Sequence, residues 1–221
     1  MKHYLPLLAS LYASLYEDLS EQRQLMSSVL AAELPEEQGG LLLRYLELIL
    51  DWNERVDLVA PAPTEKLIER HLVDSLAAAM LLSGLRPDSG LIDIGSGAGL
   101  PGIVLSIMQP TRKVVLLEPR QKRSVFLNEA KRRLGLGRAS VVTSRLENAP
   151  TDACEGVAVG VFRALTPTPA LLSALGRLLG PHGAAAYLGG PSSTIEGANV
   201  RQVPYRLGAN GPDRKLIISS V

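Results

Sequence analysis

Residues 91–102 constrain this chain most, because they combine an apolar strand, a glycine-rich turn and the start of a helix. They read Leu-Ile-Asp-Ile-Gly-Ser-Gly-Ala-Gly-Leu-Pro-Gly. Glycine lets a backbone approach a ligand closely and adopt positive φ. The free N–H groups of the helix that follows attract a negatively charged group, and Pro101 suits the first turn of that helix. The pattern predicts a ligand site at the carboxyl end of a strand. The alternative is a tight turn without a ligand.

From residue 91 onward, β-type apolar runs alternate with helical ones, which predicts βαβ units and a mostly parallel sheet. We expect strands over 91–94, 113–117, 139–143, 157–161 and 184–188, and helices over 100–108, 121–134 and 169–179. Two further β-type runs, 200–207 and 215–219, flank a turn over 208–213. They are expected to form an antiparallel hairpin at the edge of the sheet.

Residues 4–80 show helical periodicity instead. Leu8, Leu11, Tyr12, Leu15, Tyr16 and Leu19 predict a first helix, residues 25–30 a second, residues 42–50 a third that stops near 60–63, and residues 67–76 a fourth capped by Thr64. We therefore expect a helical cap over 1–83 and an α/β domain over 84–221. A signal peptide is the alternative for residues 1–13, but Pro6 and Ser10 interrupt the apolar run, so an amphipathic helix is favoured.

Composition excludes several classes of protein. The 221 residues include one cysteine, Cys154, so an intramolecular disulfide is excluded. Lys and Arg number 23 against 22 Asp and Glu, so there is no overall basic field for nucleic acid. No apolar run approaches the roughly 18 residues of a membrane span. We expect no metal site, because His3, His71 and His182 lack ligand spacing with each other or with Cys154.

The glycine turn fits two cofactors. Starting at Gly97 it matches G-x-G-x-x-G, the dinucleotide fingerprint of NAD-type oxidoreductases. Starting at Asp93 it reads D-x-G-x-G-x-G, which fits better the S-adenosylmethionine pocket of class I methyltransferases. Glu118 ends the second strand, where a carboxylate accepts both ribose hydroxyls of either cofactor. In a methyltransferase the turn over 143–147 would lie against the adenine, with Leu146 on its face. The alternative there is an ordinary strand-end turn.

Four sequence blocks carry a family resemblance. They are Arg70-His71-Leu72-Val73-Asp74-Ser75-Leu76, residues 93–102, Lys122-Arg123 and Ser144-Arg145-Leu146-Glu147. In this order and spacing they resemble the GidB/RsmG family of bacterial methyltransferases. That family methylates guanine N7 in the decoding-site loop of 16S ribosomal RNA. The continuation Leu-Pro-Gly after the glycines and the R-H-x-x-D-S-L block are its most specific marks.

The resemblance implies a class I methyltransferase fold with an N-terminal helical cap, S-adenosylmethionine as cofactor and 16S ribosomal RNA as substrate. Together with the glycine turn, it predicts cofactor contacts at Asp93, Gly95, Gly97, Gly99, Leu100, Glu118, Leu146 and Glu147. It predicts substrate contacts at Arg70, Asp74, Ser75, Arg123 and Arg163. Arg163 and His71 are the candidates for catalysis. His71 could serve as an acid or base, but guanine N7 has no proton to move, so we favour a hydrogen-bonded interface histidine.

Three positions depart from the family. Asp57-Leu58-Val59 stands where Asn-Leu-Thr is usual, Phe162 where Ser is usual, and Gly189-Gly190 where Lys-Gly is usual. The last departure removes a cation expected near the RNA. Two alternatives therefore stay open: a divergent S-adenosylmethionine enzyme with another substrate, and a catalytically silent RNA- or ribosome-binding relative.

Basic residues flank the second helix of the α/β region. They are Arg120, Lys122, Arg123, Lys131, Arg132, Arg133 and Arg138. Such a cluster forms either a solvated helix face or a patch for RNA phosphates. Arg112 and Lys113 begin the preceding strand, so we expect them at the end of the sheet opposite the cofactor. The protein is expected to be a cytoplasmic monomer that meets the small ribosomal subunit.

Overall fold

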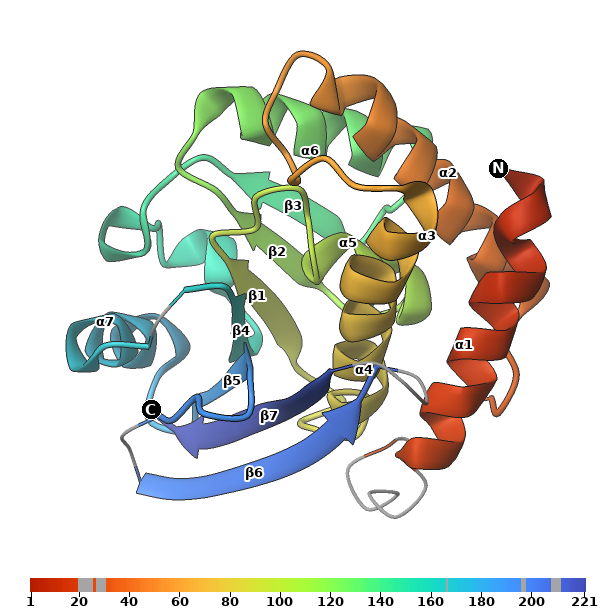
Figure 1. Cartoon of the computed structure of the whole chain (residues 1–221). Coiled ribbons are helices and arrows are strands. Elements are labelled where there is room, and N and C mark those ends of the chain that lie inside the picture. Colours follow the sequence, from red (N-terminus) through yellow and green to blue (C-terminus); the bar gives the residue numbers. More distant parts are fainter. Residues whose placement is uncertain (20–25, 27–30, 166, 196–197, 208–211) are drawn as a thin grey trace.

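The apolar runs of the sequence form one sheet. The computed structural model describes the chain except for residues 20–25, 27–30, 166, 196–197 and 208–211. Its strands are β1 (Gly90–Ile94), β2 (Val114–Leu117), β3 (Ala139–Val142), β4 (Val157–Arg163), β5 (Ala184–Gly189), β6 (Ala198–Arg206) and β7 (Asp213–Ser220). They lie in the order β3-β2-β1-β4-β5-β7-β6 (Figure 1). β1 to β5 are parallel, and β7 is antiparallel to β5 and β6. The parallel sheet and the edge hairpin are both confirmed.

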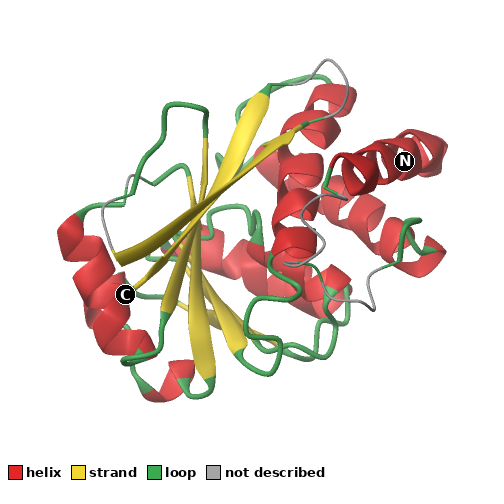
Figure 2. Cartoon of the chain, turned by 90° about the horizontal axis from the view of Figure 1, so that it is seen from below, coloured by secondary structure: helices red, strands yellow, loops and turns green. Residues whose placement is uncertain are grey.

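Helices cover both faces of this sheet. They are α1 (Leu5–Asp18), α2 (Glu36–Asn53), α3 (Thr64–Leu67), α4 (Val73–Leu81), α5 (Gly102–Met108), α6 (Gln121–Arg133) and α7 (Pro169–Leu179). A π-helical turn, η3 (Ile68–Leu72), joins α3 to α4. Short 3-10 turns are η1 (Lys2–Tyr4), η4 (Leu146–Asn148) and η5 (Asp152–Cys154). Figure 2 shows α7 on one side of the sheet and the N-terminal helices on the other. None of the described helices is long and apolar enough to cross a membrane.

The alternation of side chains along each strand decides which layer a residue meets. On β4, Val161 belongs to the hydrophobic cluster under α4, α5 and α6, whereas Phe162 belongs to the cluster under α7. The next residue, Arg163, turns back to the first side and pairs with Asp74 of α4. The strand end therefore presents Arg163 to the N-terminal helices.

The N-terminal helices share their hydrophobic core with the sheet. Leu8 of α1, Leu42 of α2 and Leu76 of α4 lie in the same buried cluster as Leu91 of β1 and Val114 of β2. A division into units at residue 83 stays a prediction, and the core runs across that boundary.

Arg112 closes the connection between α4 and β1. It is buried and donates to the carbonyl oxygens of Leu82, Leu85, Arg86 and Ser89. These residues precede β1, so Arg112 lies at the amino end of the parallel strands, as expected.

Helix boundaries in the N-terminal region differ from the sequence prediction. α2 ends at Asn53, before the predicted stop near 60–63, because the side chain of Asn53 binds the chain that follows. Its Oδ1 accepts from the N–H groups of Leu58 and Val59, and its Nδ2 donates to the carbonyl of Val59. The prediction that Thr64 caps the fourth helix is wrong. The cap residue is Pro63, whose fixed φ suits that position, and Thr64 is the first helical residue.

The predicted strands and the predicted helices of the α/β region agree with the structure within two residues at each end. The N-terminal helices are longer than the periodic residues that predicted them, because α2 begins at Glu36 and α4 ends at Leu81. The predicted helix over 25–30 lies outside the described residues apart from Met26, and so does most of the predicted turn over 208–213.

Phe162 is a core residue on the side of β4 away from Arg163. It is fully buried, and its ring stacks on Tyr187 with centroids 5.5 Å apart and planes inclined by 25°. Phe162, at the position where the resemblance predicts serine, therefore contributes to packing under α7.

Replacing Phe162 with serine is expected to lower the free energy of unfolding by about 3–5 kcal/mol, because the change opens a cavity and buries a hydroxyl. Urea denaturation measures the effect. The control Phe162→Leu keeps most of the apolar volume and should cost less than half as much. A Phe162→Ser protein within about 1 kcal/mol of the wild type would contradict this assignment.

Candidate active site

The glycine loop between β1 and α5 turns an open side outward at Gly95 and Gly97. Both residues have left-handed backbone, with φ of +69° and +58°. Among the described residues other than its chain neighbours, none has an atom within 4 Å of the place where a Cβ of Gly95 would stand, and the nearest such atom for Gly97 is Arg123 Nη1 at 3.6 Å. A ligand can therefore approach the backbone closely here, as predicted for a cofactor.

Gly99 faces the protein instead. A Cβ there would collide with Ile103 of α5, and it would lie 3.0 Å from Leu127 and 3.1 Å from the hydroxyl of Tyr45. The alternate glycines thus have different roles. Gly95 and Gly97 leave space for a ligand, and Gly99 lets side chains of α5, α6 and α2 pack closely against the loop.

Asp93 fixes the start of α5. Its Oδ2 accepts from the N–H of Gly102 at 3.0 Å, and its backbone oxygen accepts from Ser96 Oγ at 2.9 Å. The residue is only 1% exposed, so its carboxylate does not reach the open side of the loop. Burial raises the pKa of Asp93 to about 7, against the opposing effect of the Gly102 N–H. We infer that Asp93 positions the loop that would hold the cofactor.

Two more side chains hold the loop. The Tyr45 hydroxyl, buried on α2, donates to the carbonyl of Ala98. Glu118 follows β2, and its Oε2 accepts from the N–H of Gly97 at 2.8 Å while its Oε1 accepts from the N–H of Arg120 at 2.9 Å. The sequence predicted only that Tyr45 lies in the helix over 42–50, because helical periodicity does not show what its hydroxyl reaches.

The other predicted cofactor residues lie at neighbouring strand ends. Leu100 is half-buried in the loop, and Leu146 and Glu147 open η4 just after β3. Leu146 is buried in the cluster that contains Ile94 and Leu117, while Glu147 is exposed. The structure thus brings the three predicted pieces of the cofactor site to the carboxyl edge of β1, β2 and β3.

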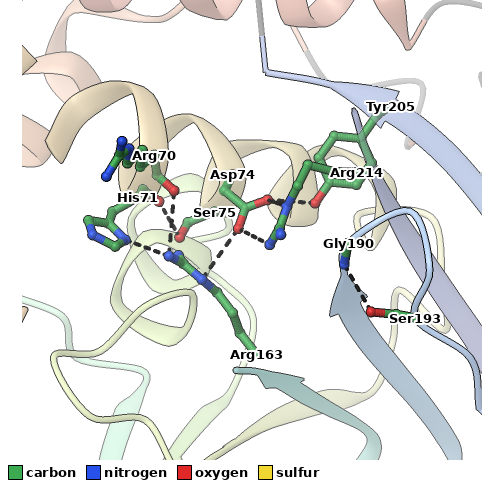
Figure 3. A network of polar contacts seen from close by, with 9 residues as sticks. All are labelled: Arg70, His71, Asp74, Ser75, Arg163, Gly190, Ser193, Tyr205 and Arg214. Atoms are coloured by element: carbon green, nitrogen blue, oxygen red, sulfur yellow. Dashed lines mark hydrogen bonds and ion pairs between the residues drawn. The ribbon is translucent and has the colours of Figure 1, made fainter. Parts of the chain in front are cut away.

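A second group of polar residues gathers around the buried carboxylate of Asp74 (Figure 3). Asp74 is 1% exposed and accepts from the Tyr205 hydroxyl at 2.7 Å. Arg214 donates to both of its oxygens, at 3.2 and 2.9 Å, and Arg163 Nε lies 3.3 Å from Oδ2. Tyr205 and Arg214 come from the edge hairpin and were absent from the sequence prediction. Their pairing depends on the register of β6 and β7, in which they are direct partners.

His71 belongs to the π-helical turn η3, a kind of turn that is frequent at functional sites. Its side chain contacts Arg163 at the end of β4. Its Nδ1 accepts from Arg163 Nη2, which also reaches the carbonyl of Arg70 at 3.5 Å. Burial, followed by the charge of Arg163, lowers the pKa of His71 to about 4. The imidazole is therefore neutral at pH 7, and accepting at Nδ1 places its proton on Nε2.

The predicted substrate residues divide in the structure. Arg163, His71 and Asp74 meet in one network, joined by the backbone of Arg70. Ser75 is fully buried, and its hydroxyl donates to the carbonyl of His71 at 2.7 Å, which leaves no free face toward a ligand.

Two further predicted substrate residues lie apart from that network. The guanidinium of Arg70 is exposed. Arg123 lies at the glycine loop, where its Nη2 donates to the carbonyl of Asp57 at 2.6 Å.

One atom of this site is buried without a partner among the described residues: Nη1 of Arg163. A buried donor without an acceptor is costly, and native sites reserve such groups for ligands or water. The open cradle at Gly95 and Gly97 and the spare donor of Arg163 together fit a cofactor and an acceptor-bearing substrate. Within the described ranges no group of three or more His, Cys, Asp or Glu side chains is placed to hold a metal ion.

The family model of rRNA small subunit methyltransferase G (GidB) matches residues 38–209. The chain belongs to this family. Among its relatives is the ribosomal RNA small subunit methyltransferase G of Halorhodospira halophila, 36% identical over 170 residues that cover 72% of this chain and 78% of that protein. Its counterpart in Acidothermus cellulolyticus is 39% identical over 162 residues, covering 73% and 67%.

Solved structures agree on the fold. A SAM-dependent methyltransferase from Aquifex aeolicus superposes with a TM-score of 0.51 at 18% identity, covering 71% of this chain and 93% of that one. A mutant of MtNAS in complex with S-adenosylmethionine gives 0.53 at 13% identity, covering 99% and 91%. The fold is that of class I methyltransferases. Family membership decides between the two interpretations of the glycine turn, in favour of S-adenosylmethionine over a dinucleotide.

Removing the Asp74 carboxylate is expected to be strongly destabilising. Asp74→Ala leaves Arg163 and Arg214 without a counter-charge, which costs about 3–5 kcal/mol for a buried pair. The control is Glu69→Ala, which breaks the exposed Lys66–Glu69 pair and should cost less than about 1 kcal/mol. Urea denaturation compares the two, and equal losses would contradict the central role of Asp74.

Asp93 is expected to make stability depend on pH. Its pKa is about 7 in the folded state and near the ordinary 3.8 when unfolded. Between these values the folded protein holds a proton that the unfolded chain has released. The stability that Asp93 contributes is therefore fully present below pH 4. As the pH rises to 7, the free energy of unfolding falls by about 4 kcal/mol. Asp93→Asn removes this loss, so the stability of the variant relative to wild type should rise across that range. Parallel curves in urea denaturation would contradict the assignment.

Proposed function

We propose that this protein transfers a methyl group from S-adenosylmethionine to N7 of a guanine in the decoding-site loop of 16S ribosomal RNA. One observation carries the proposal beyond family membership. The open glycine cradle and the spare donor of Arg163 lie at the carboxyl ends of the adjacent strands β1 and β4. Ligands of open α/β sheets bind at this edge.

The cofactor half of the site would consist of backbone and carboxylates. Gly95 and Gly97 would let the cofactor approach the backbone closely. Glu118 would accept hydrogen bonds from the ribose hydroxyls, and the adenine would be bordered by Leu146 and Glu147. Glu118 already accepts from Gly97 N, so one carboxylate would organise both the loop and the ribose. When bound, S-adenosylmethionine supplies an electrophilic methyl group on a sulfonium sulfur.

The reaction requires the protein to position the two reactants and does not require it to transfer a proton. Guanine N7 carries a lone pair and no proton, so no general base is needed. Holding two reactants in line is by itself worth several kcal/mol, on the order of 7–11 in favourable cases. The neutral, hydrogen-bonded His71 fits this requirement, because it orients Arg163 by accepting its hydrogen bond and stays uncharged at pH 7. Methyl transfer from a sulfonium also needs no metal ion.

Arg163 would hold the substrate. Arginine is the usual reader of the guanine edge that carries N7 and O6. Once N7 takes the methyl group it can no longer accept a hydrogen bond, so we assign the Arg163 donor to O6 or to a phosphate. Asp74 would position Arg163, and Ser75 would support the turn that carries His71. We further propose that the enzyme acts as a monomer in the cytoplasm, where small subunits are assembled.

Gly189 favours a second candidate, a methyltransferase of this family with another target nucleotide. A side chain at position 189 would meet Ser193 at 2.5 Å, so the family's lysine does not fit unless the turn moves. That turn is closed by hydrogen bonds in both directions between Gly190 and Ser193. The cation is therefore absent from the end of β5, although Lys215 is the cross-strand neighbour of Gly189.

A methyl-transfer assay on small ribosomal subunits, taken from a strain that lacks the modification, distinguishes these candidates. The protein should transfer labelled methyl from S-adenosylmethionine to one guanine N7 in the decoding-site loop. Label on a different nucleotide would support the second candidate. Absence of label, with S-adenosylmethionine still bound, would support a catalytically silent relative and overturn the proposal.

In that assay Arg163→Ala is expected to reduce methyl transfer by at least about a hundredfold, as for loss of a donor that acts at a reacting group. Its dissociation constant for S-adenosylmethionine, measured by calorimetry, should stay within a few-fold of the wild-type value. Arg177→Ala, an exposed arginine on α7, is the control and should change neither quantity. An equal loss of cofactor binding in Arg163→Ala would rule out the substrate role.

A further inference from the structure

The structure separates the basic residues around α6 into two groups at opposite ends of the helix. Arg132 and Arg133, in the last turn, both bind Glu129, and Arg138 donates to the carbonyl of Thr111. Arg120, Lys122 and Arg123 lie at the first turn, beside the glycine loop. The helix has 13 residues and a rise of about 1.5 Å per residue, so the two groups do not form one patch.

The first group borders a cavity of about 300 Å³. Its walls come from the turn after α2, with Arg55 and Asp57, and from the start of α6, with Arg120, Lys122 and Arg123. We call this cavity the basic pocket. Four cations and one carboxylate give these five side chains a net charge of +3, whereas the whole chain carries only +1.

The walls of the basic pocket are held in place. Trp52 of α2 packs edge-to-face on Phe126 of α6, with ring centroids 5.6 Å apart. Arg123 bridges the two walls through its hydrogen bond to the carbonyl of Asp57. The pocket therefore exists without a ligand to organise it.

The cations that remain are available to a ligand. Arg55, Arg120 and Lys122 are exposed, and within the described part of the chain their side chains make no hydrogen bond or ion pair. The pocket also adjoins the cofactor cradle, because Arg123 Nη1 lies 3.6 Å from the Cβ position of Gly97. An anion bound here would lie beside the glycine cradle of the cofactor site.

We propose that the basic pocket binds a backbone phosphate of the substrate RNA, next to the nucleotide that is methylated, with Arg55 and Arg120 as its principal donors. This inference rests on the proposed function. The pocket favours a phosphate over a base, because its lining holds only one apolar side chain, Val56, and no aromatic ring on which a base would stack. Arginine matches a phosphate through its fork of N–H donors.

The test is the double variant Arg55→Gln/Arg120→Gln, assayed for binding to protein-free 16S ribosomal RNA and for methylation of small subunits. Both side chains are exposed, so the variant is expected to fold, and its melting temperature tests this. The matched control, Arg177→Gln/Arg201→Gln, removes the same charge from exposed positions on α7 and β6. Arg55→Lys/Arg120→Lys keeps the charge and should recover part of the affinity.

The pocket variant is expected to bind RNA about tenfold more weakly and to show a correspondingly higher KM with unchanged kcat. Its salt dependence should also fall, with the slope of log K against log salt reduced by about 0.7 for the loss of one neutralised phosphate on a single strand. Affinity for S-adenosylmethionine and all properties of the control should match the wild type.

Three outcomes would overturn the inference. If the pocket variant matches the control while the wild type methylates and binds RNA, this inference fails and the proposed function stands. If binding to intact subunits weakens but binding to protein-free RNA does not, the pocket faces an acidic ribosomal protein. If the wild type neither binds nor methylates the RNA, the proposed function and this inference fail together.

Discussion

Three parts of the chain meet at one buried carboxylate. Asp74 on α4 binds Arg163 from the end of β4, and it binds Tyr205 and Arg214 from the hairpin β6–β7. A buried charge is tolerated only when partners replace its lost hydration. Here those partners have to come from elements far apart in sequence, so satisfying Asp74 requires the helical layer, the centre of the sheet and its antiparallel edge to dock together. The same requirement fixes the guanidinium of Arg163 at the active-site edge.

The site depends on rigidity more than on acid–base chemistry. Tyr45, Asp93 and Glu118 hold the glycine loop from α2, β1 and β2, and His71 and Asp74 hold Arg163. A nucleophile without a proton needs such positioning, and the low pKa of His71 agrees with a histidine that serves as a fixed acceptor. The two glycines of the cradle, both at positive φ, leave room for a ligand to approach the backbone.

The departures from the family differ in their physical meaning. Phe162 faces α7, so it changes packing and leaves the face with Arg163 untouched. Gly189 lies under the turn closed by Ser193, and the space of a longer side chain is taken. Asp57 offers its backbone carbonyl to Arg123, a contact that does not depend on its side chain. Only the change at Gly189 removes a charged group from the edge of the site.

The sequence by itself determined the alternation of strands and helices, the glycine loop and the edge hairpin, because hydrophobic period and turn chemistry are local properties. Local signals also led to errors: Thr64 is a good cap by type, but Pro63 takes the position, and Asn53 ends α2 through contacts that periodicity does not contain. Only the tertiary structure decided which glycines face a ligand, what Tyr45 and Asp74 bind, and which arginines around α6 are free. Those properties depend on strand register and on the packing of segments that are distant in sequence. A local sequence pattern determines neither of these.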